Sequence, residues 1–147
     1  MTAKESLEDV IGAHATVEAM VTEDMTAHAL GSGDVIVLAT PTILALAERA
    51  AVQALAKTGR VPEGATTVGT SVKLVHLEPS PIGAIVRATA SLDRVAGRRY
   101  HFIFNVWDAA GEIAGGAHVR VLVDKRKFEE AAVARLSVPG ADSGPES

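Results

Sequence analysis

One segment of the chain constrains the fold more than any other: residues 38–55, LATPTILALAERAAVQAL, carry the one convincing helix pattern. Thr40 and Pro41 are typical of a helix start, the first as an N-cap and the second as a first-turn proline. Gly59 and Pro62 are typical of a helix end. The segment is apolar on nearly every side, so we expect this helix to lie at the centre of the fold.

The rest of the chain shows mainly strand patterns. Alternating polar and apolar residues, separated by turns rich in Gly and Pro, predict strands at 14–21, 64–79, 84–95, 98–108 and 113–124. The last four suggest an antiparallel meander, and a short charged helix is predicted at 124–136. A single long helix has only the sheet to bury against. The pattern therefore predicts an α+β fold, with a curved antiparallel sheet of about five strands wrapped around one central helix.

The length of 147 residues favours a single domain with a substantial core. Only 3% of the residues are aromatic, so the core must be largely aliphatic. We assign residues 1–136 to this domain and 137–147, SVPGADSGPES, to a disordered tail because of their composition. The polar, Gly-containing connection at 22–34 is predicted to be a loop or lid before the helix.

The composition argues against several classes of function. A net charge of −4 offers no broad basic surface for nucleic acid or for an anionic membrane. The five histidines lack the close spacing of a zinc site and there is no cysteine, so we expect no metal and no redox cofactor. The sequence starts with acidic residues where a secretory signal is apolar, and no run approaches the roughly 20 apolar residues of a membrane span. These features predict a cytoplasmic protein.

Glu48 interrupts the apolar surface of the helix. Its neighbours three and four residues away are Leu44, Ala45, Ala51 and Val52. An ionised carboxylate without a partner is unfavourable in such a place, so Glu48 is expected to be paired, protonated or beside a wet cleft. A plainer alternative puts it at the edge of the apolar stripe, paired with Arg49 or with an arginine of a strand.

His76 repeats this pattern on a strand. With a period of two, it shares the more apolar face of the strand with Val68, Thr70, Val72 and Leu74. That face would meet the helix, so His76 and Glu48 would converge on one interior. Such a pair can supply a general base and a nucleophile. The plainer alternative is a core histidine bonded to a backbone carbonyl.

Thr40 adds a hydroxyl at the start of the helix, where unpaired amides and the helix dipole favour a developing oxyanion. A simple N-cap is the alternative. Thr40 and Glu48 are eight residues apart, about 12 Å along a helix axis, so they cannot touch within one helix. Either the two residues flank one substrate or one of them comes from a second subunit.

Four segments together resemble the single-hotdog-domain acyl-CoA thioesterases, and most closely their fluoroacetyl-CoA thioesterase-like branch. The segments are LATPTILALAERA, VGTSVKLVHLEP, VAGRRYHFIFNVWD and GGAHVR, and the resemblance covers residues 38–128. It implies the hotdog fold, in which a curved antiparallel sheet wraps one helix. It also implies a homodimer or higher homo-oligomer, with active sites at the subunit interface and an acyl-CoA as the substrate.

The resemblance carries specific residues as well. The family has a threonine just before the helix, a glutamate within it and a histidine on the next strand, which fall on Thr40, Glu48 and His76. The resemblance implies that these three are catalytic. A glycine and an arginine associated with the acyl pocket fall on Gly69 and Arg120, which are implied to bind the substrate.

The alternation of the last strand disagrees with the resemblance at Arg120. The residues it places on the core face are Ala117, Val119, Val121 and Val123, so Arg120 would point the other way. A bulge at 115–116, or a partner subunit, would be needed to bring Arg120 to the pocket.

The predicted function is hydrolysis of a small to medium acyl-CoA to the free acid and CoA. In the family, the fluoroacetyl-specific enzyme has a phenylalanine-containing lid before the helix. This chain has no aromatic residue before Tyr100, so we expect a broader acyl range. Two alternatives stay open: a hotdog enoyl-CoA hydratase or dehydratase, and a non-catalytic dimer that binds acyl-CoA.

Overall fold

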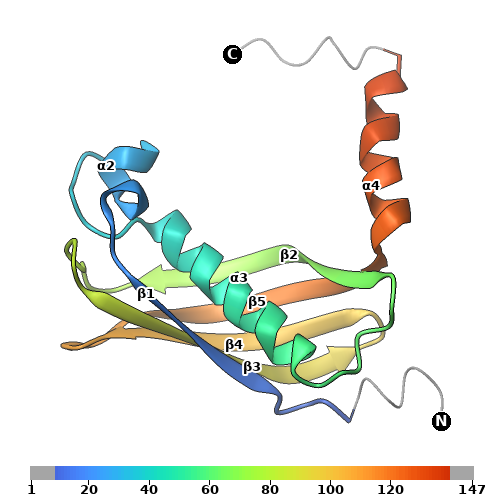
Figure 1. Ribbon diagram of the computed structural model, residues 1–147, viewed down its shortest axis with the longest axis horizontal. Helices are drawn as coiled ribbons and strands as arrows, with labels where there is room; N and C mark the ends of the chain where they lie inside the picture. The colour runs from blue at the N-terminus through green and yellow to red at the C-terminus, as the bar shows by residue number, and fades with distance from the viewer. Residues whose placement is uncertain (1–8, 140–147) are drawn as a thin grey trace.

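The computed structural model describes residues 9–139 of the chain (Figure 1). Its elements are β1 (His14–Met20), the 3-10 helix η1 (Glu23–Met25), α2 (Ala27–Leu30), α3 (Thr40–Ala56), β2 (Ala65–His76), β3 (Ile85–Ala96), β4 (Arg99–Asp108), β5 (Gly111–Asp124), α4 (Lys125–Ala134) and the 3-10 helix η2 (Arg135–Ser137). Every predicted strand and both predicted helices are present. The predicted disordered tail, 137–147, lies for the most part outside the described residues.

The five strands form one antiparallel sheet in the order β1-β3-β4-β5-β2. Strands β3, β4 and β5 form a meander as predicted, but β2 pairs with β5 at the far edge and not with β3. The predicted four-strand meander was wrong on this point, because alternation marks strands without marking their neighbours. α3 connects β1 to β2 across one face of the sheet, and these two strands lie at opposite edges (Figure 1).

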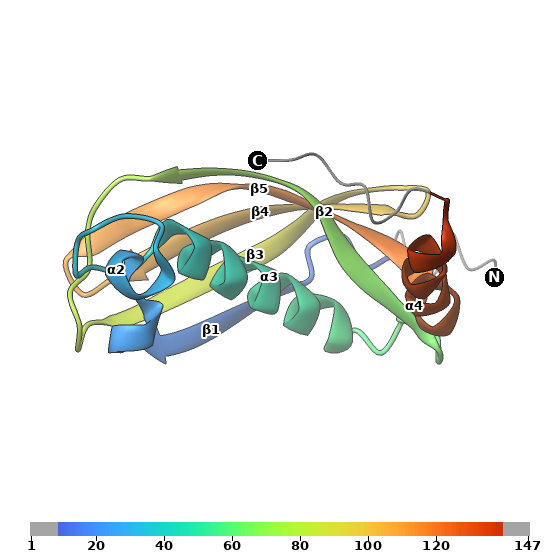
Figure 2. The ribbon, with the colours of Figure 1, turned by 90° about the horizontal axis from the view of Figure 1, so that it is seen from above.

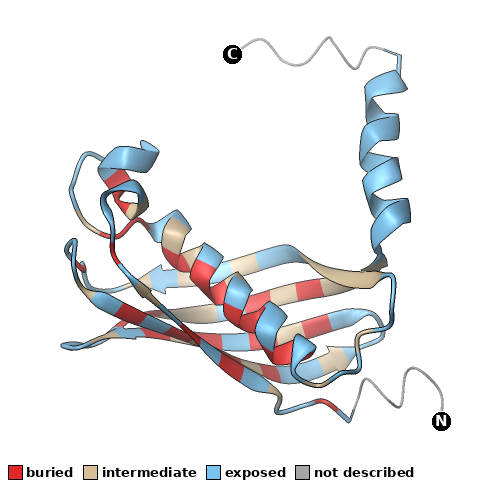
Figure 3. Ribbon diagram, viewed as in Figure 1, coloured by how far each residue is buried: buried red, intermediate tan, exposed pale blue. Residues whose placement is uncertain are grey.

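The helix and the sheet meet in a largely aliphatic core, around which the sheet curves (Figure 2). The buried side chains of α3 are Ile43, Leu46, Ala47, Ala50, Ala51, Ala54 and Leu55. The alanines among them let the helix lie close to the strands. The buried residues follow the side of α3 that faces the sheet (Figure 3). β4 adds the buried rings of Tyr100, Phe102 and Phe104 to the same core.

A bulge in β2 decides which of its side chains face α3. The register with β5 shifts between Gly69 and Ser71, which leaves Thr70 as the extra residue. The side chains on the helix side are Thr67 before the bulge and Val72, Leu74 and His76 after it, with Gly69 contributing only backbone there. The predicted continuous face from Val68 to His76 was therefore right only for its second half.

β5 presents His118 and Arg120 to the helix, so the prediction that Arg120 points away was wrong. Both side chains are buried, at 1% and 6% exposure. The partner strand β4 fixes this face, because Arg120 lies opposite Tyr100 and His118 lies opposite Phe102 under α3. The residues left on the other face are Ala117, Val119, Val121 and Val123. The pairing of β5 with β2 is regular across 115–116, so the predicted bulge is not what turns Arg120 inward.

The charged helix α4 stands away from the sheet and none of its residues is buried (Figure 3). Asp124 caps it by accepting from the Lys127 backbone N–H at 2.9 Å. Within residues 9–139, the structure contains no helix that is both long enough and apolar enough to cross a membrane.

Candidate active site

Thr40 and His76 meet at the N-terminal end of α3. Thr40 is the first residue of the helix, and its predicted role as N-cap is wrong: Ala39 occupies that position. The Thr40 hydroxyl oxygen lies 2.8 Å from Nδ1 of His76 instead. Thr40 is exposed and His76 is half-buried, so solvent and substrate can reach the pair.

The partners of His76 define which ring nitrogen carries the proton. Its Nε2 lies 3.0 Å from the backbone carbonyl oxygen of Glu78, which can only accept a hydrogen bond. The neutral ring therefore carries its proton on Nε2, and its Nδ1 accepts from the Thr40 hydroxyl. A hydroxyl that points at an imidazole lone pair is the arrangement in which a histidine activates a hydroxyl or a water.

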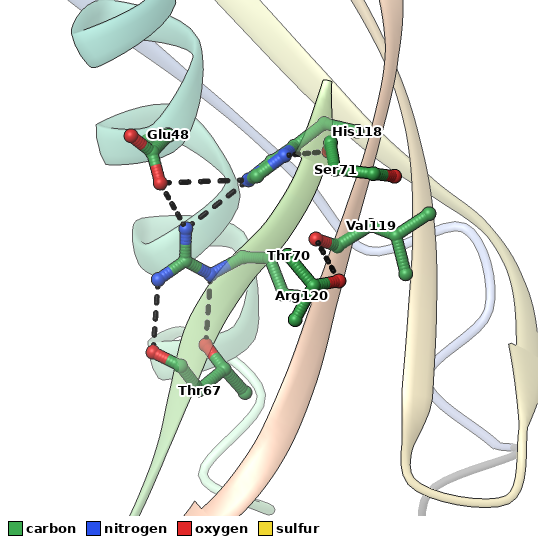
Figure 4. A network of polar contacts seen from close by, with 7 residues as sticks. All are labelled: Glu48, Thr67, Thr70, Ser71, His118, Val119 and Arg120. Carbon is green, nitrogen blue, oxygen red and sulfur yellow. Dashed lines mark hydrogen bonds and ion pairs between the residues drawn. The ribbon is translucent and has the colours of Figure 1, made fainter. Parts of the chain in front are cut away.

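Glu48 lies about two turns further along α3, on the side that faces β2 and β5 (Figure 4). Its Oε2 accepts from Nη1 of Arg120 at 3.0 Å, which confirms the alternative of an ion pair with a strand arginine. The Glu48 side chain is 36% exposed. Figure 4 shows its second carboxylate oxygen directed away from the pair.

The guanidinium of Arg120 is held at all three of its nitrogens. Its Nε donates to the Thr67 hydroxyl at 2.9 Å and its Nη2 donates to the Thr67 carbonyl at 2.8 Å. Its Nη1 bonds to Glu48 and also lies 3.1 Å from Nε2 of His118. Burial lowers the pKa of Arg120 and the bond to Glu48 partly offsets this, so the side chain stays a cation at neutral pH.

His118 belongs to the same cluster, although the sequence did not single it out as a site residue. Its Nδ1 lies 2.9 Å from the carbonyl oxygen of Ser71, beside the β2 bulge. Burial lowers the pKa of His118, and the charge of Arg120 lowers it further, against the opposing effects of Ser71 and Glu48. One signal could have found it: it stands two residues before Arg120, and residues two apart on a strand share a face.

Gly69 makes room for the Glu48 carboxylate. A Cβ built on Gly69 would overlap Oε2 of Glu48 and would lie 3.1 Å from Cε1 of His118. The absence of a side chain at this position is therefore what allows the carboxylate to reach Arg120 between α3 and β2.

Replacing Gly69 by Ala should lower kcat/KM for an acyl-CoA roughly ten- to a hundredfold, because a displacement of about 1 Å in a reacting group has effects of that size. The protein should still fold, because the atom displaced is the end of a flexible side chain. Thr70→Ala is the matched control, since it removes one hydroxyl bond to Val119 from the same bulge and adds no atom. Steady-state kinetics and thermal unfolding of the two variants check this; equal activity in both would show that the carboxylate position does not matter.

The predicted site residues form two clusters and not one. Thr40 and His76 form the first, beside a hollow of about 200 Å³ at the end of β2. Glu48, Gly69 and Arg120 form the second, beside a hollow of about 400 Å³ along α3. The first cluster offers a base and a hydroxyl, and the second offers a carboxylate anchored by a cation. Within residues 9–139, no three His, Asp or Glu side chains are placed to hold a metal ion.

A five-stranded antiparallel sheet wrapped around one long helix defines the hotdog fold. A hot-dog-like protein from Thermanaerovibrio acidaminovorans shows it with a TM-score of 0.78 at 24% identity, over 88% of this chain and 96% of that one. Within this class, the chain belongs to the fluoroacetyl-CoA-specific thioesterase family, whose model matches residues 21–126.

Two relatives within the family are similar over much of the chain. The fluoroacetyl-CoA thioesterase of Streptantibioticus cattleyicolor is 35% identical over 92 residues, which are 63% of this chain and 65% of that protein, so the match spans somewhat less than two thirds of it. A crystal structure of a variant of the fluoroacetyl-CoA-specific thioesterase FlK, in complex with fluoroacetate and CoA, superposes with a TM-score of 0.75 at 29% identity. It covers 80% of this chain and 98% of that one.

Proposed function

We propose that the protein hydrolyses acyl-CoA thioesters to the free acid and CoA. The observation that carries the proposal is the hydrogen bond from the Thr40 hydroxyl to Nδ1 of His76, in a chain of this thioesterase family. Thioester hydrolysis needs an activated oxygen nucleophile, a donor for the oxyanion and a proton for the leaving thiolate. Thr40, His76 and Glu48 supply these groups.

The proposal includes a homodimer that completes the site. Glu48 lies about 12 Å along the helix axis from Thr40, too far to act on the same carbonyl group within one chain. The 12-residue strand β2 runs beside both clusters and pairs on one side only in the described chain. Val75 and Leu77 at its end are 53% and 58% exposed, and Val52 beside Glu48 is 44% exposed.

A long unpaired strand with exposed apolar neighbours is a template for pairing with a second copy. We expect the β2 edges of two chains to meet and to bring Glu48 of one chain to the Thr40–His76 pair of the other. Each dimer would then hold two equivalent sites. The acyl group would lie between the helix of one chain and the strand of its partner.

The three residues take distinct roles in this arrangement. The Thr40 hydroxyl turns from His76 to the thioester carbonyl and donates to the oxyanion as it forms. The Nδ1 of His76 is then free to take a proton from water and to return it to the departing thiolate. Glu48, with one oxygen bonded to Arg120, presents the other to the site of reaction. In one route it orients the water whose proton His76 takes. In the other it attacks the carbonyl carbon and the C–S bond breaks; a water deprotonated by His76 then hydrolyses the acyl–Glu48 anhydride, and the thiolate takes that proton.

The roles proposed for Gly69 and Arg120 follow from their contacts with Glu48. Gly69 leaves the space that the carboxylate occupies, and Arg120 holds one of its oxygens. These two residues therefore shape the pocket for the acyl group and fix the direction of the reacting oxygen.

The enzyme should accept a range of short, medium and branched acyl groups. The segment before α3 offers exposed aliphatic side chains, Leu30, Val35 and Ile36, in place of aromatic rings. Size alone discriminates small changes in a substrate by about 1–3 kcal/mol, so fluoroacetyl-CoA and acetyl-CoA should be hydrolysed within about one or two orders of magnitude of each other. Competition among acetyl-, fluoroacetyl-, butyryl- and phenylacetyl-CoA, followed by release of free thiol, measures this directly.

The same panel separates the proposed function from its alternatives. A hydratase would add water to crotonyl-CoA and release no thiol, and a binding protein would hold acyl-CoA without turnover. A preference for fluoroacetyl-CoA far above a hundredfold would show that the aliphatic segment before α3 selects as strictly as a ring would.

A further inference from the structure

His118 is a buried, titratable side chain that takes no part in the proposed reaction. Its ring is 1% exposed and packs near Phe102, with ring centroids 6.3 Å apart. Nevertheless both of its nitrogens make polar contacts. Nδ1 lies 2.9 Å from the Ser71 carbonyl and Nε2 lies 3.1 Å from Nη1 of Arg120 (Figure 4).

These contacts allow one protonation state. The Ser71 carbonyl can only accept, so Nδ1 carries the proton; the Arg120 guanidinium can only donate, so Nε2 is the acceptor. The two hydrogens of Nη1 are then shared between His118 and Oε2 of Glu48, at 3.1 and 3.0 Å. A continuous chain of hydrogen bonds runs from the β2 bulge through His118 and Arg120 to Glu48.

We infer that His118 is a positioning residue: its neutral ring orients Arg120 and, through Arg120, aims the Glu48 carboxylate at the substrate. A proton on Nε2 would replace this acceptor with a donor that faces the guanidinium. Oε2 of Glu48, 4.0 Å from Nε2, would then be drawn to His118 and away from Arg120. His118 thus makes hydrolysis sensitive to acid. The catalytic part of this inference rests on the proposed function, and the geometric part does not.

The charged groups that face the ring are few. β5 itself contributes Arg120 and α3 contributes Glu48, while β2 contributes the Ser71 carbonyl and β4 the Phe102 ring, neither of which titrates. Burial lowers the pKa of His118 below its ordinary value of about 6.5, so the folded protein favours the neutral ring. The contribution of His118 to the free energy of unfolding is complete above pH 6.5, the ordinary pKa of histidine. It is lost as the pH falls through the lowered pKa of the folded protein.

Two variants separate positioning from packing. His118→Phe keeps the ring volume beside Phe102 but removes the acceptor, so kcat should fall roughly ten- to a hundredfold. His118→Gln places an amide oxygen near the position of Nε2, accepts from Arg120 and does not titrate, so it should restore most of that activity. The low-pH fall in kcat/KM should involve one protonation more in the wild-type protein than in the His118→Gln variant, because the amide does not titrate. Equal losses in both variants, or an unchanged pH profile in His118→Gln, would overturn the inference.

A measurement without substrate tests the geometry by itself. In protein labelled with ¹³C at glutamate carboxyl carbons and ¹⁵N at histidine, the Glu48 carboxyl signal should shift as His118 takes up its proton, and this shift should vanish in His118→Gln. If the chemical shift of the Glu48 carboxyl carbon did not change as His118 took up its proton, the chain of hydrogen bonds from His118 to Glu48 would be contradicted, even in an active enzyme. If the coupling is present but the wild-type protein releases no thiol from any acyl-CoA, the proposed function fails and the geometric inference stands.

Discussion

Replacing Glu48 by Gln should lower kcat/KM for a short acyl-CoA by a factor of about 100 or more, as expected for a group that acts in the transition state. The amide oxygen of Gln still accepts from Arg120, so the buried guanidinium keeps a partner and the protein should unfold cooperatively as before. What the variant lacks is the negative oxygen that faces the substrate. The effect should therefore appear mainly in kcat and much less in the affinity for acyl-CoA.

Glu18→Gln is the matched control for this variant. Glu18 also pairs with an arginine, Arg87, at 2.8 Å, but both side chains are more than half exposed, and the pair lies on β1 and β3, at the edge of the sheet opposite β2. The same chemical change there should leave hydrolysis unaltered. If the Glu48 variant turned over at the rate of the Glu18 variant, the carboxylate of α3 would have no catalytic role.

His76→Ala should have an effect of similar size, about a hundredfold or more in kcat/KM, because it removes the acceptor that faces the Thr40 hydroxyl and the group that moves the proton. Thr40→Val, which keeps the shape of the side chain, should also lower kcat by about a hundredfold, as removal of an oxyanion donor does. Steady-state kinetics of both variants and of a double variant check the pair. Because the two residues act as a unit, the double variant should lose little more than either single one.

His14→Ala provides the control for a lost imidazole. His14 lies on β1, at the opposite edge of the sheet from β2, and its Nδ1 lies 3.1 Å from the Gly12 carbonyl oxygen. Its removal should leave the kinetics unchanged. If His76→Ala kept full activity, His76 would have no catalytic role and would serve only the hydrogen bond from its Nε2 to the Glu78 carbonyl.

Much of the fold could be predicted from the sequence, because its strongest signals are local. The apolar helix with Pro41 near its start, and β4 with its alternating Tyr100, Phe102 and Phe104, both follow from side-chain periodicity. Strand order could not be predicted in this way. β2 joins β5 at the edge of the sheet, and that choice depends on how α3 packs across the face, which no local pattern records.

The sequence named five candidate site residues, but not their arrangement in two clusters. The face that β2 turns to α3 changes at the bulge at Thr70, because one extra residue reverses every side chain beyond it. On β5, alternation divides the side chains into two faces but does not say which face meets the helix. The more apolar face, with Val119 and Val121, was taken as the core face, and the pairing with β4 shows that Arg120 lies on the core face instead. His118 was missed because a buried histidine is recognised by its partners, here Ser71 and Arg120, and these are brought to it by other strands. Thr40 was predicted to be the N-cap because the local sequence does not show that its hydroxyl bonds to His76, which is 36 residues further along the chain.

Mixed dimers of two inactive variants test most directly whether the catalytic centre is shared between two chains. Glu48→Gln and His76→Ala chains are unfolded together, refolded in equal amounts and assayed for thiol release from butyryl-CoA. If Glu48 of one chain serves His76 of the other, half of the dimers carry one intact site and the mixture should recover about a quarter of wild-type activity. Activity no higher than that of the two variants refolded separately would contradict a site built from two chains.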